Sequence, residues 1–331
     1  MFQGLFSLSV IVVLTAALNY FKYSGLQFNN RCNLTVSDTT ILKGIAILMV
    51  VIGHIGTAIP GFRIFTPLGA TGVGLFLICS GFGIEKSFQK NGLANFWKKR
   101  FVNVWLPYAL IELLALPIHI EFGVTNILLD FLLIKPLHPF GWYMRFLFIW
   151  YFVFYLSCYI NIKKKNALLF IVALIYILCS DSLHAQVSFC FLIGIWMTKT
   201  SNLALIIRKS NFVVLLACSI CLFIIRDYFK VNLIDIRLAW NIISFFYYST
   251  LILSVLIGYK IFSVKYNYPP HYWSGIAWVG LYSYELYLVH GYTYAIIDVN
   301  ASYSSIILFI VMNIVGTYVY KNVSSFINRL F

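Results

Sequence analysis

The sequence predicts an all-α, polytopic membrane protein with about eleven transmembrane helices. Of its 331 residues, 61% are hydrophobic and only 10% are charged, and the mean hydropathy is +0.88. A soluble domain carries about 25% charged residues. The apolar segments are roughly 15 to 22 residues long, which suits transmembrane helices and not the ten-residue alternating strands of an outer-membrane barrel. These observations indicate an integral membrane protein.

We expect one transmembrane domain over residues 1–331, made of an extra N-terminal helix with a cytosolic linker (1–40) and a ten-helix core (41–321). The first segment has neither a basic n-region nor an A-x-A cleavage site, so we expect it to be retained and not removed as a signal peptide. The predicted spans are residues 2–21, 41–59, 69–85, 101–118, 142–160, 166–182, 185–198, 211–226, 238–259, 275–296 and 303–320.

The placement of the 24 Lys and Arg residues predicts the orientation. With these spans, eighteen of them fall in loops on one side of the membrane, five fall on the other, and Arg145 lies within a span. The positive-inside rule assigns the richer side to the cytoplasm, which places the N-terminus outside and the C-terminus inside a plasma membrane. The net charge of +14 therefore indicates topology and contact with membrane lipids, and not binding of nucleic acid.

Metal binding is not expected from the cysteines. The chain has seven, six of them within apolar segments, and none has metal-ligand spacing with a histidine. We interpret them as small buried hydrophobic residues. The sequence therefore predicts no metal site.

The segment from Lys43 to His54 is an apolar helix with a cation at its start and an imidazole at its end. Eleven positions at about 100° per residue place both side chains on one helix face, roughly 16 Å apart along the axis. A lysine at the membrane edge extends to water, but an ionisable side chain deep in a span is a functional-site candidate. We therefore single out His54.

A basic stretch and a group of glycines can each be interpreted in two ways. The basic stretch that includes Lys98, Lys99 and Arg100 is either a topology anchor that contacts anionic lipid or a phosphate-binding patch for a cytosolic donor such as a coenzyme A thioester. The glycines around Gly72 permit either close helix contact or the approach of a ligand to the backbone.

The charged residues Arg145, Glu112 and Glu285 and the histidine His290 also lie within predicted spans. Arg145 needs a partner or an aqueous cavity, and both Glu112 and Glu285 are candidate partners. Glu285 either pairs, lines water or holds a proton. His290 either makes structural hydrogen bonds or lines a site.

Several motifs occur in a fixed order along residues 40–320. They are Lys43-Gly44-Ile45-Ala46 with His54, Gly72-Val73-Gly74-Leu75-Phe76 with Ser80-Gly81-Phe82, Lys99-Arg100 with Pro107-Tyr108, Phe191-Leu192-Ile193-Gly194-Ile195, and Ser283-Tyr284-Glu285-Leu286-Tyr287-Leu288-Val289-His290. This ordered set resembles the integral-membrane acyltransferase family 3, whose members O-acylate envelope glycans and similar acceptors. Each motif alone is weak evidence, but the set is specific.

The resemblance implies a ten-helix core that uses cytosolic acyl-CoA, with acetyl-CoA expected as the donor. It also implies a glycan or glycolipid acceptor whose hydroxyl lies at or beyond the outer half of the membrane, with His54 as the catalytic residue. For the second catalytic residue we expect Glu285, and either Glu285 or Ser80 would orient His54. The donor-binding residues are expected to be Lys43, Lys98, Lys99 and Arg100, and the substrate-binding residues Ser80, Arg145, Tyr284 and His290.

Two positions depart from the family pattern. Lys43 stands where the family usually has arginine, so the charge is kept but the bidentate guanidinium is lost. Asn103 stands where a second arginine is common. We therefore expect the grip on the donor, or the choice of donor, to differ.

Two other classes of protein stay open on the sequence alone. One is a transporter or exporter of a lipid-linked glycan, which would use the intramembrane charges Arg145, Glu285 and His54 as a substrate path. The other is a membrane scaffold subunit without chemistry.

Overall fold

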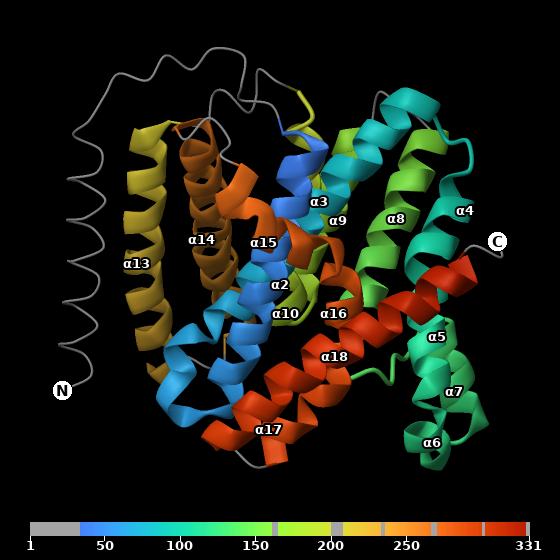
Figure 1. The fold of residues 1–331 in the computed structure, drawn as a ribbon. Helices are drawn as coiled ribbons and strands as arrows, with labels where there is room; N and C mark the ends of the chain where they lie inside the picture. Colours follow the sequence, from blue (N-terminus) through green and yellow to red (C-terminus); the bar gives the residue numbers. More distant parts are fainter. Residues whose placement is uncertain are drawn as a thin grey trace.

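The computed structural model describes residues 34–160, 165–199, 208–232, 236–265, 270–299 and 302–328, and over these residues the protein is all-α (Figure 1). The predicted first span, 2–21, lies outside the described residues. The helices of the first half are α2 (Val36–Ala58), α3 (Pro67–Asn91), α4 (Phe96–Arg100), α5 (Leu106–Leu114), α6 (Leu116–His119), α7 (Val124–Phe131) and α8 (Trp142–Ile160). Those of the second half are α9 (Lys165–Cys179), α10 (Ser182–Ala185), α11 (Cys190–Trp196), α13 (Lys209–Asn232), α14 (Arg237–Lys265), α15 (Pro270–Leu281), α16 (Ser283–Thr293), α17 (Ala295–Val299) and α18 (Tyr303–Asn328).

Every predicted span from 41–59 onward coincides with a helix or with consecutive shorter helices. The predicted 101–118, 185–198 and 275–296 segments are each broken into two or more helices. Among the described residues, five helices are long and apolar enough to cross a membrane, or six if the bent pair Phe96–Leu114 and Leu116–Phe122 is one span. The structure therefore supports a multi-pass membrane protein, whereas eleven crossings and the orientation stay predictions.

The predicted 101–118 segment bends by 67° at Ala115, between α5 and α6, and it is also distorted earlier, at the start of α5. Pro107 has no N–H to donate, and the residues before it, η2 (Phe101–Trp105), form a turn of π-helix. Prolines and π-turns distort helices because they interrupt the regular hydrogen bonding. Tyr284 of α16 donates its hydroxyl to the Val104 carbonyl within this turn at 2.5 Å. The distortion thus creates a contact between the α4–α5 region and α16.

The centre of the protein is formed by α2, α3 and α11, which pack at close range. Gly81 of α3 lies against the backbone carbonyl of Phe191, and Gly194 of α11 lies against that of Ile78. A Cβ atom at either glycine would collide with the facing carbonyl oxygen. Small residues let helix backbones approach in a membrane. Close helix contact therefore explains these two glycines.

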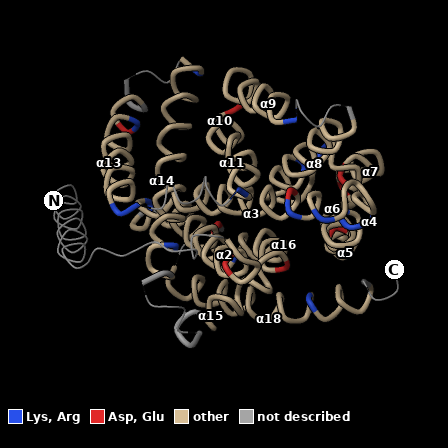
Figure 2. The backbone as a smooth tube through the Cα atoms, turned by 90° about the horizontal axis from the view of Figure 1, so that it is seen from above, with Lys and Arg blue, Asp and Glu red and all other residues tan. Residues whose placement is uncertain are grey.

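The remaining helices surround this centre. Seen from above, α13 lies at the rim beside α14, whereas α16 lies between α2 and α18 (Figure 2). α15 packs on α2, and the backbones meet where Gly280 faces the Thr40 carbonyl and Gly44 faces the Ile276 carbonyl. This arrangement brings the late helices α15 and α16 against the helix that carries Lys43 and His54.

Substitution of Gly81 by alanine should destabilise the protein, because the added methyl group overlaps the Phe191 carbonyl at the α3–α11 contact. We expect a loss of about 1–3 kcal/mol, the usual cost of overpacking a close contact. The measurement is the thermal unfolding midpoint of Gly81→Ala in detergent. Gly83→Ala, two positions along the same helix and with open space around it, is the control that should be neutral or slightly stabilising. Equal midpoints for the two variants would contradict the packing argument.

Candidate active site

The ring of His54 lies in an aromatic cluster at the C-terminal end of α2. It stacks on Phe140 with ring centroids 3.9 Å apart, and the rings of His290 and Tyr294 lie 5.3 and 5.4 Å away. The side chain is partly exposed. Within the described residues neither imidazole nitrogen has a hydrogen-bond partner. Both nitrogens are therefore available to a substrate.

Phe140 is held against His54 by the turn that precedes α8. The Nε2–H of His138 donates to the Leu288 carbonyl at 2.8 Å, while Nδ1 accepts the N–H of Phe140 at 3.1 Å. The Tyr287 hydroxyl donates to the Phe140 carbonyl at 2.6 Å. These bonds fix a neutral His138. Burial lowers the pKa of His138 to about 4, against a smaller opposing effect of the hydrogen bond to Leu288.

His290 faces the same cluster from α16. Its Nδ1 lies 2.5 Å from the Tyr287 carbonyl and 3.2 Å from the Leu286 carbonyl. Because a carbonyl only accepts, Nδ1 carries the hydrogen and Nε2 is left as an acceptor. This Nε2 is fully buried and has no partner among the described residues. An unpaired buried acceptor is costly, so one beside His54 indicates a position where a donor binds.

A row of polar side chains connects this cluster to the basic stretch before η2. Arg100 is half-buried, with its guanidinium 4.3 Å from the ring centre of Phe96 and 5.7 Å from that of Tyr151. Ser80 lies near the hydroxyls of Tyr151 and Tyr143. The row runs from Arg100 past Ser80 into the interior.

The row continues from Tyr143 to the histidines. The rings of Tyr143 and Tyr287 are 5.1 Å apart, and the rings of Tyr287 and His290 are also 5.1 Å apart. Tyr284, a further predicted site residue, is held by its bond to Val104 and lies near Tyr143. The structure therefore brings Arg100, Ser80, Tyr284, His290 and His54 into one connected region.

The lysines that are predicted to bind the acyl donor lie at the edge of this connected region. Lys43 is partly exposed on the same helix as His54 and lies near Cys79 of α3. Lys98 is exposed and Lys99 is partly exposed, beside the half-buried Arg100. Asn103 is exposed and donates to the Lys99 carbonyl at 2.8 Å, which stabilises the π-turn.

Glu285 is not placed as an assistant to His54. Its carboxylate forms an ion pair with Lys321 of α18 at 2.7 Å. Five helical positions separate Glu285 from His290, which turns the two side chains about 140° apart around α16. The ion pair with Lys321 agrees with the expectation that a buried carboxylate has a partner. Glu285 is therefore not the partner of Arg145.

Arg145 also lies apart from the histidines. Its side chain is exposed, and in the described part of the chain it forms no ion pair. It lines an apolar groove of about 650 Å³ with Trp97, Trp105 and Phe148 among the walls. The other suggested partner, Glu112, is bound by Tyr292 and lies close to His119. The expected partners of Arg145 were therefore wrong, because its helix face points outward.

Sequence reasoning missed the turn that holds Phe140. His138 was visible as a histidine in the connection before α8, but its partner Leu288 is 150 residues away. No local pattern indicates such a contact. The same holds for Tyr143 and Tyr151, which resemble ordinary apolar-helix aromatics until Ser80 is seen between them.

His138 predicts a loss of stability in acid. In the folded state its pKa is about 4, and in the unfolded chain about 6.5. The unfolded state therefore binds more protons between these values, so the free energy of unfolding falls as the pH drops from about 6.5 to 4 and is unaffected by this group above that range. At pH 5 the loss is about 2 kcal/mol. Unfolding midpoints at pH 7.5 and 5.0 should fall less in His138→Gln than in the wild type; parallel falls would exclude His138 as the cause.

Comparison with known proteins gives one family. A family model described as an acyltransferase domain matches residues 38–326, which contain all the site residues discussed above. No curated protein and no solved structure is significantly similar to the chain.

Proposed function

The chain belongs to acyltransferase family 3, and on this premise we propose that it transfers an acetyl group from cytosolic acetyl-CoA to a hydroxyl of a cell-envelope or exported glycan. Membership of the family indicates an acyltransferase enzyme that uses an acyl donor. The acetyl group, the glycan acceptor, the contact with membrane lipids and the role of His54 are our proposal. The observation that carries it is the partly exposed imidazole of His54, whose two nitrogens have no hydrogen-bond partner in the described part of the chain, at the end of a polar row that begins at Arg100.

The geometry addresses the main physical problem, which is that the donor and acceptor approach from opposite sides of the membrane. α2 is continuous from Val36 to Ala58, so Lys43 and His54 lie about 16 Å apart along one helix. We propose that Arg100, with Lys43, Lys98 and Lys99 nearby, binds the phosphates of coenzyme A. The flexible pantetheine arm then extends along Ser80 and Tyr143, so that the thioester reaches His54.

Two routes of transfer are compatible with His54. As a general base, one ring nitrogen takes the proton of the acceptor hydroxyl, the oxygen attacks the thioester carbonyl, and the C–S bond breaks. The proton then passes from the imidazolium to the departing thiolate. As a nucleophile, the nitrogen itself attacks the carbonyl, the C–S bond breaks, and the proton of the other ring nitrogen passes to the departing thiolate, which leaves an acyl-imidazole. The acceptor hydroxyl then attacks the acyl group, the N–C bond breaks, and the hydroxyl proton returns to the imidazole. The attacking hydroxyl has a single proton, which His54 takes, so the Nε2 of His290 can accept a hydrogen bond from a neighbouring hydroxyl of the acceptor.

The glycan-exporter alternative receives less support. It needs Arg145, Glu285 and His54 to line one path. Glu285 is neutralised by Lys321, and the exposed Arg145 lines a separate apolar groove. The polar row instead leads from a basic patch to a histidine, as a thioester-dependent transfer requires.

Replacing His54 by alanine should abolish acyl transfer but leave the fold intact. Purified protein in nanodiscs would be given labelled acetyl-CoA and a glycan acceptor, and both thiol release and acylated product would be measured. We expect a loss of at least about 10³-fold, within the range of general acid–base and covalent contributions. His184→Gln, which changes a histidine of α10 paired with Asp181, is the control that should retain activity. Retained transfer in His54→Ala would refute the assignment. Release of one thiol per wild-type protein without acceptor would identify the nucleophilic route.

Arg100→Ala should weaken donor binding more than it slows the chemical step. The loss of one charge-assisted phosphate contact should raise KM for acetyl-CoA about tenfold, with a smaller change in kcat. The control is Lys135→Ala, since Lys135 is an exposed lysine that donates to Asn126 and should leave KM unchanged when it is replaced. An unchanged KM in Arg100→Ala would remove this residue from the donor site.

A further inference from the structure

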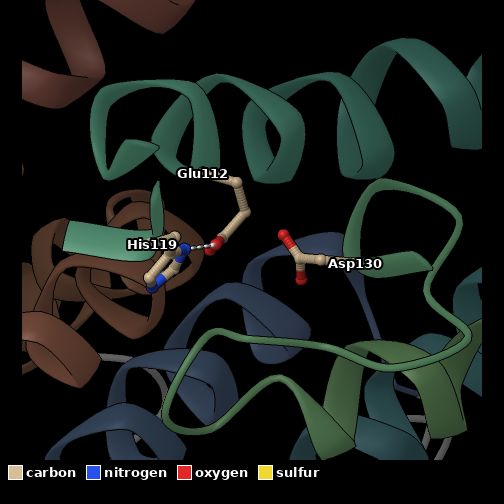
Figure 3. A group of neighbouring side chains, drawn as sticks. All are labelled: Glu112, His119 and Asp130. Atoms are coloured by element: carbon tan, nitrogen blue, oxygen red, sulfur yellow. Dashed lines mark ion pairs between the residues drawn. The ribbon is translucent and has the colours of Figure 1, made fainter. Parts of the chain in front are cut away.

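A second polar cluster lies outside the proposed acyl-transfer region. Glu112 of α5, His119 of α6 and Asp130 of α7 converge on one point, although they come from three short helices (Figure 3). All three side chains are buried, and Glu112 and Asp130 are each only 1% exposed. One ligand atom from each lies within 4.8 Å of the others.

Each carboxylate has one oxygen that is held and one that is unoccupied. Oε2 of Glu112 accepts the Tyr292 hydroxyl at 2.8 Å and lies 3.4 Å from Nδ1 of His119. Oδ1 of Asp130 accepts the Tyr108 hydroxyl at 2.5 Å and the Leu137 N–H at 2.8 Å. The other oxygens, Oε1 of Glu112 and Oδ2 of Asp130, are buried without a partner among the described residues.

This pattern is that of carboxylates oriented to ligate a cation. In metal sites, outer hydrogen bonds fix one carboxylate oxygen so that the other points at the ion. Two buried carboxylates are also electrostatically unfavourable unless a cation or a proton lies between them. In the part of the chain that the structure describes, no lysine or arginine contacts Glu112 or Asp130. The compensating charge has to come from something else.

We propose that Glu112, His119 and Asp130 form a binding site for a divalent transition-metal ion, with Zn²⁺ as the best match. One imidazole and two carboxylates are ligands that Zn²⁺ accepts, whereas Mg²⁺ and Ca²⁺ prefer oxygen ligands alone. Three protein ligands leave one position for water. Because ligand atoms around Zn²⁺ lie about 3.3 Å apart, the ligand atoms, now within 4.8 Å of one another, draw together by up to about 1.5 Å when the ion binds.

The proposed ion would have a structural role, because its ligands are connected to the elements around His54. Glu112 is tied through Tyr292 to α16, two residues from His290, and the Tyr292 ring lies 4.9 Å from that of His138. Asp130 is tied through Leu137 to the turn that carries His138 and Phe140. A bound ion would therefore fasten α5, α6 and α7 to the helix and the turn that surround His54.

The test is the metal content of the full-length protein, purified without chelator and analysed by mass spectrometry. We expect close to one Zn²⁺ per chain, lost after dialysis against a chelator and restored by ZnCl₂ but not by MgCl₂ or CaCl₂. Restoring the ion should raise the unfolding midpoint by about 5 °C at a hundredfold excess over its dissociation constant. Glu112→Gln and Asp130→Asn, which keep shape and remove charge, should each lower the metal content at least tenfold.

Asp181→Asn is the matched control. Asp181 and His184 are an exposed pair, with Nδ1 and Oδ1 2.5 Å apart, so they are the place where adventitious metal would bind. Metal that stays in Glu112→Gln but leaves in Asp181→Asn would overturn the proposal. So would a metal-free wild type whose midpoint no cation changes, since a shared proton would then hold the carboxylates together. If the Glu112 variant does not fold, the chelator-treated wild type is titrated with Co²⁺ instead. Absorption bands that saturate at one Co²⁺ per chain would support the site. The absence of such bands would refute it.

Discussion

The close approach of α2 to α3 is the constraint on which the rest of the structure depends. Gly53 faces the backbone at Gly69, and Gly72 faces the Ala46 carbonyl, so that a Cβ at Gly53 or Gly72 would strike the other helix. Between helices in lipid, the hydrophobic effect gives no driving force, and contact depends on van der Waals packing through small residues. Because α2 carries His54 and α3 carries Ser80, this contact also sets the position of the site.

The buried polar groups fall into two kinds: those that are paired with another side chain and stabilise the fold, and those that lack a partner and are available to a ligand. Lys260 pairs with Asp38, which also accepts the Tyr259 hydroxyl, and Lys165 pairs with Glu85. Buried polar groups in proteins are almost always satisfied in this way. The described exceptions that matter here gather in two places: the histidine pair around Phe140, and the carboxylates beside His119. Trp150, Asn241, Asn313 and Thr317 each hold a further unpaired buried atom, but these groups are neutral, whereas buried ionisable groups without a partner indicate sites.

α16 connects the aromatic cluster around His54 with the carboxylates beside His119. His290 faces His54, and Tyr292, two residues later, donates to Glu112. Between them Gly291 has no side chain, and a Cβ there would overlap the His138 ring. His138 in turn bonds to the Leu288 carbonyl on the same helix. One turn of α16 therefore contacts the catalytic candidate, the turn whose aromatic ring stacks on it, and the proposed metal ligand Glu112.

The sequence by itself determined the features that depend on neighbouring residues. Composition indicated the all-α membrane class, helical periodicity placed Lys43 and His54 on one face of one helix, and the ordered motifs identified the family. The positions of the helices also followed, because long apolar segments have few other stable conformations in a membrane. Continuous spans were predicted where Ala115 and Tyr282 interrupt the helix, since the effect of a local break depends on what packs against it.

Only the tertiary structure decided which side chains meet. It paired Glu285 with Lys321, turned Arg145 outward, stacked Phe140 on His54, and brought Glu112, His119 and Asp130 together from a region that had been read as the end of one span and a loop. The physical reason is distance along the chain. Contacts such as His138 with Leu288 join residues 150 positions apart, and they depend on how helices cross, which no local spacing of residue types records.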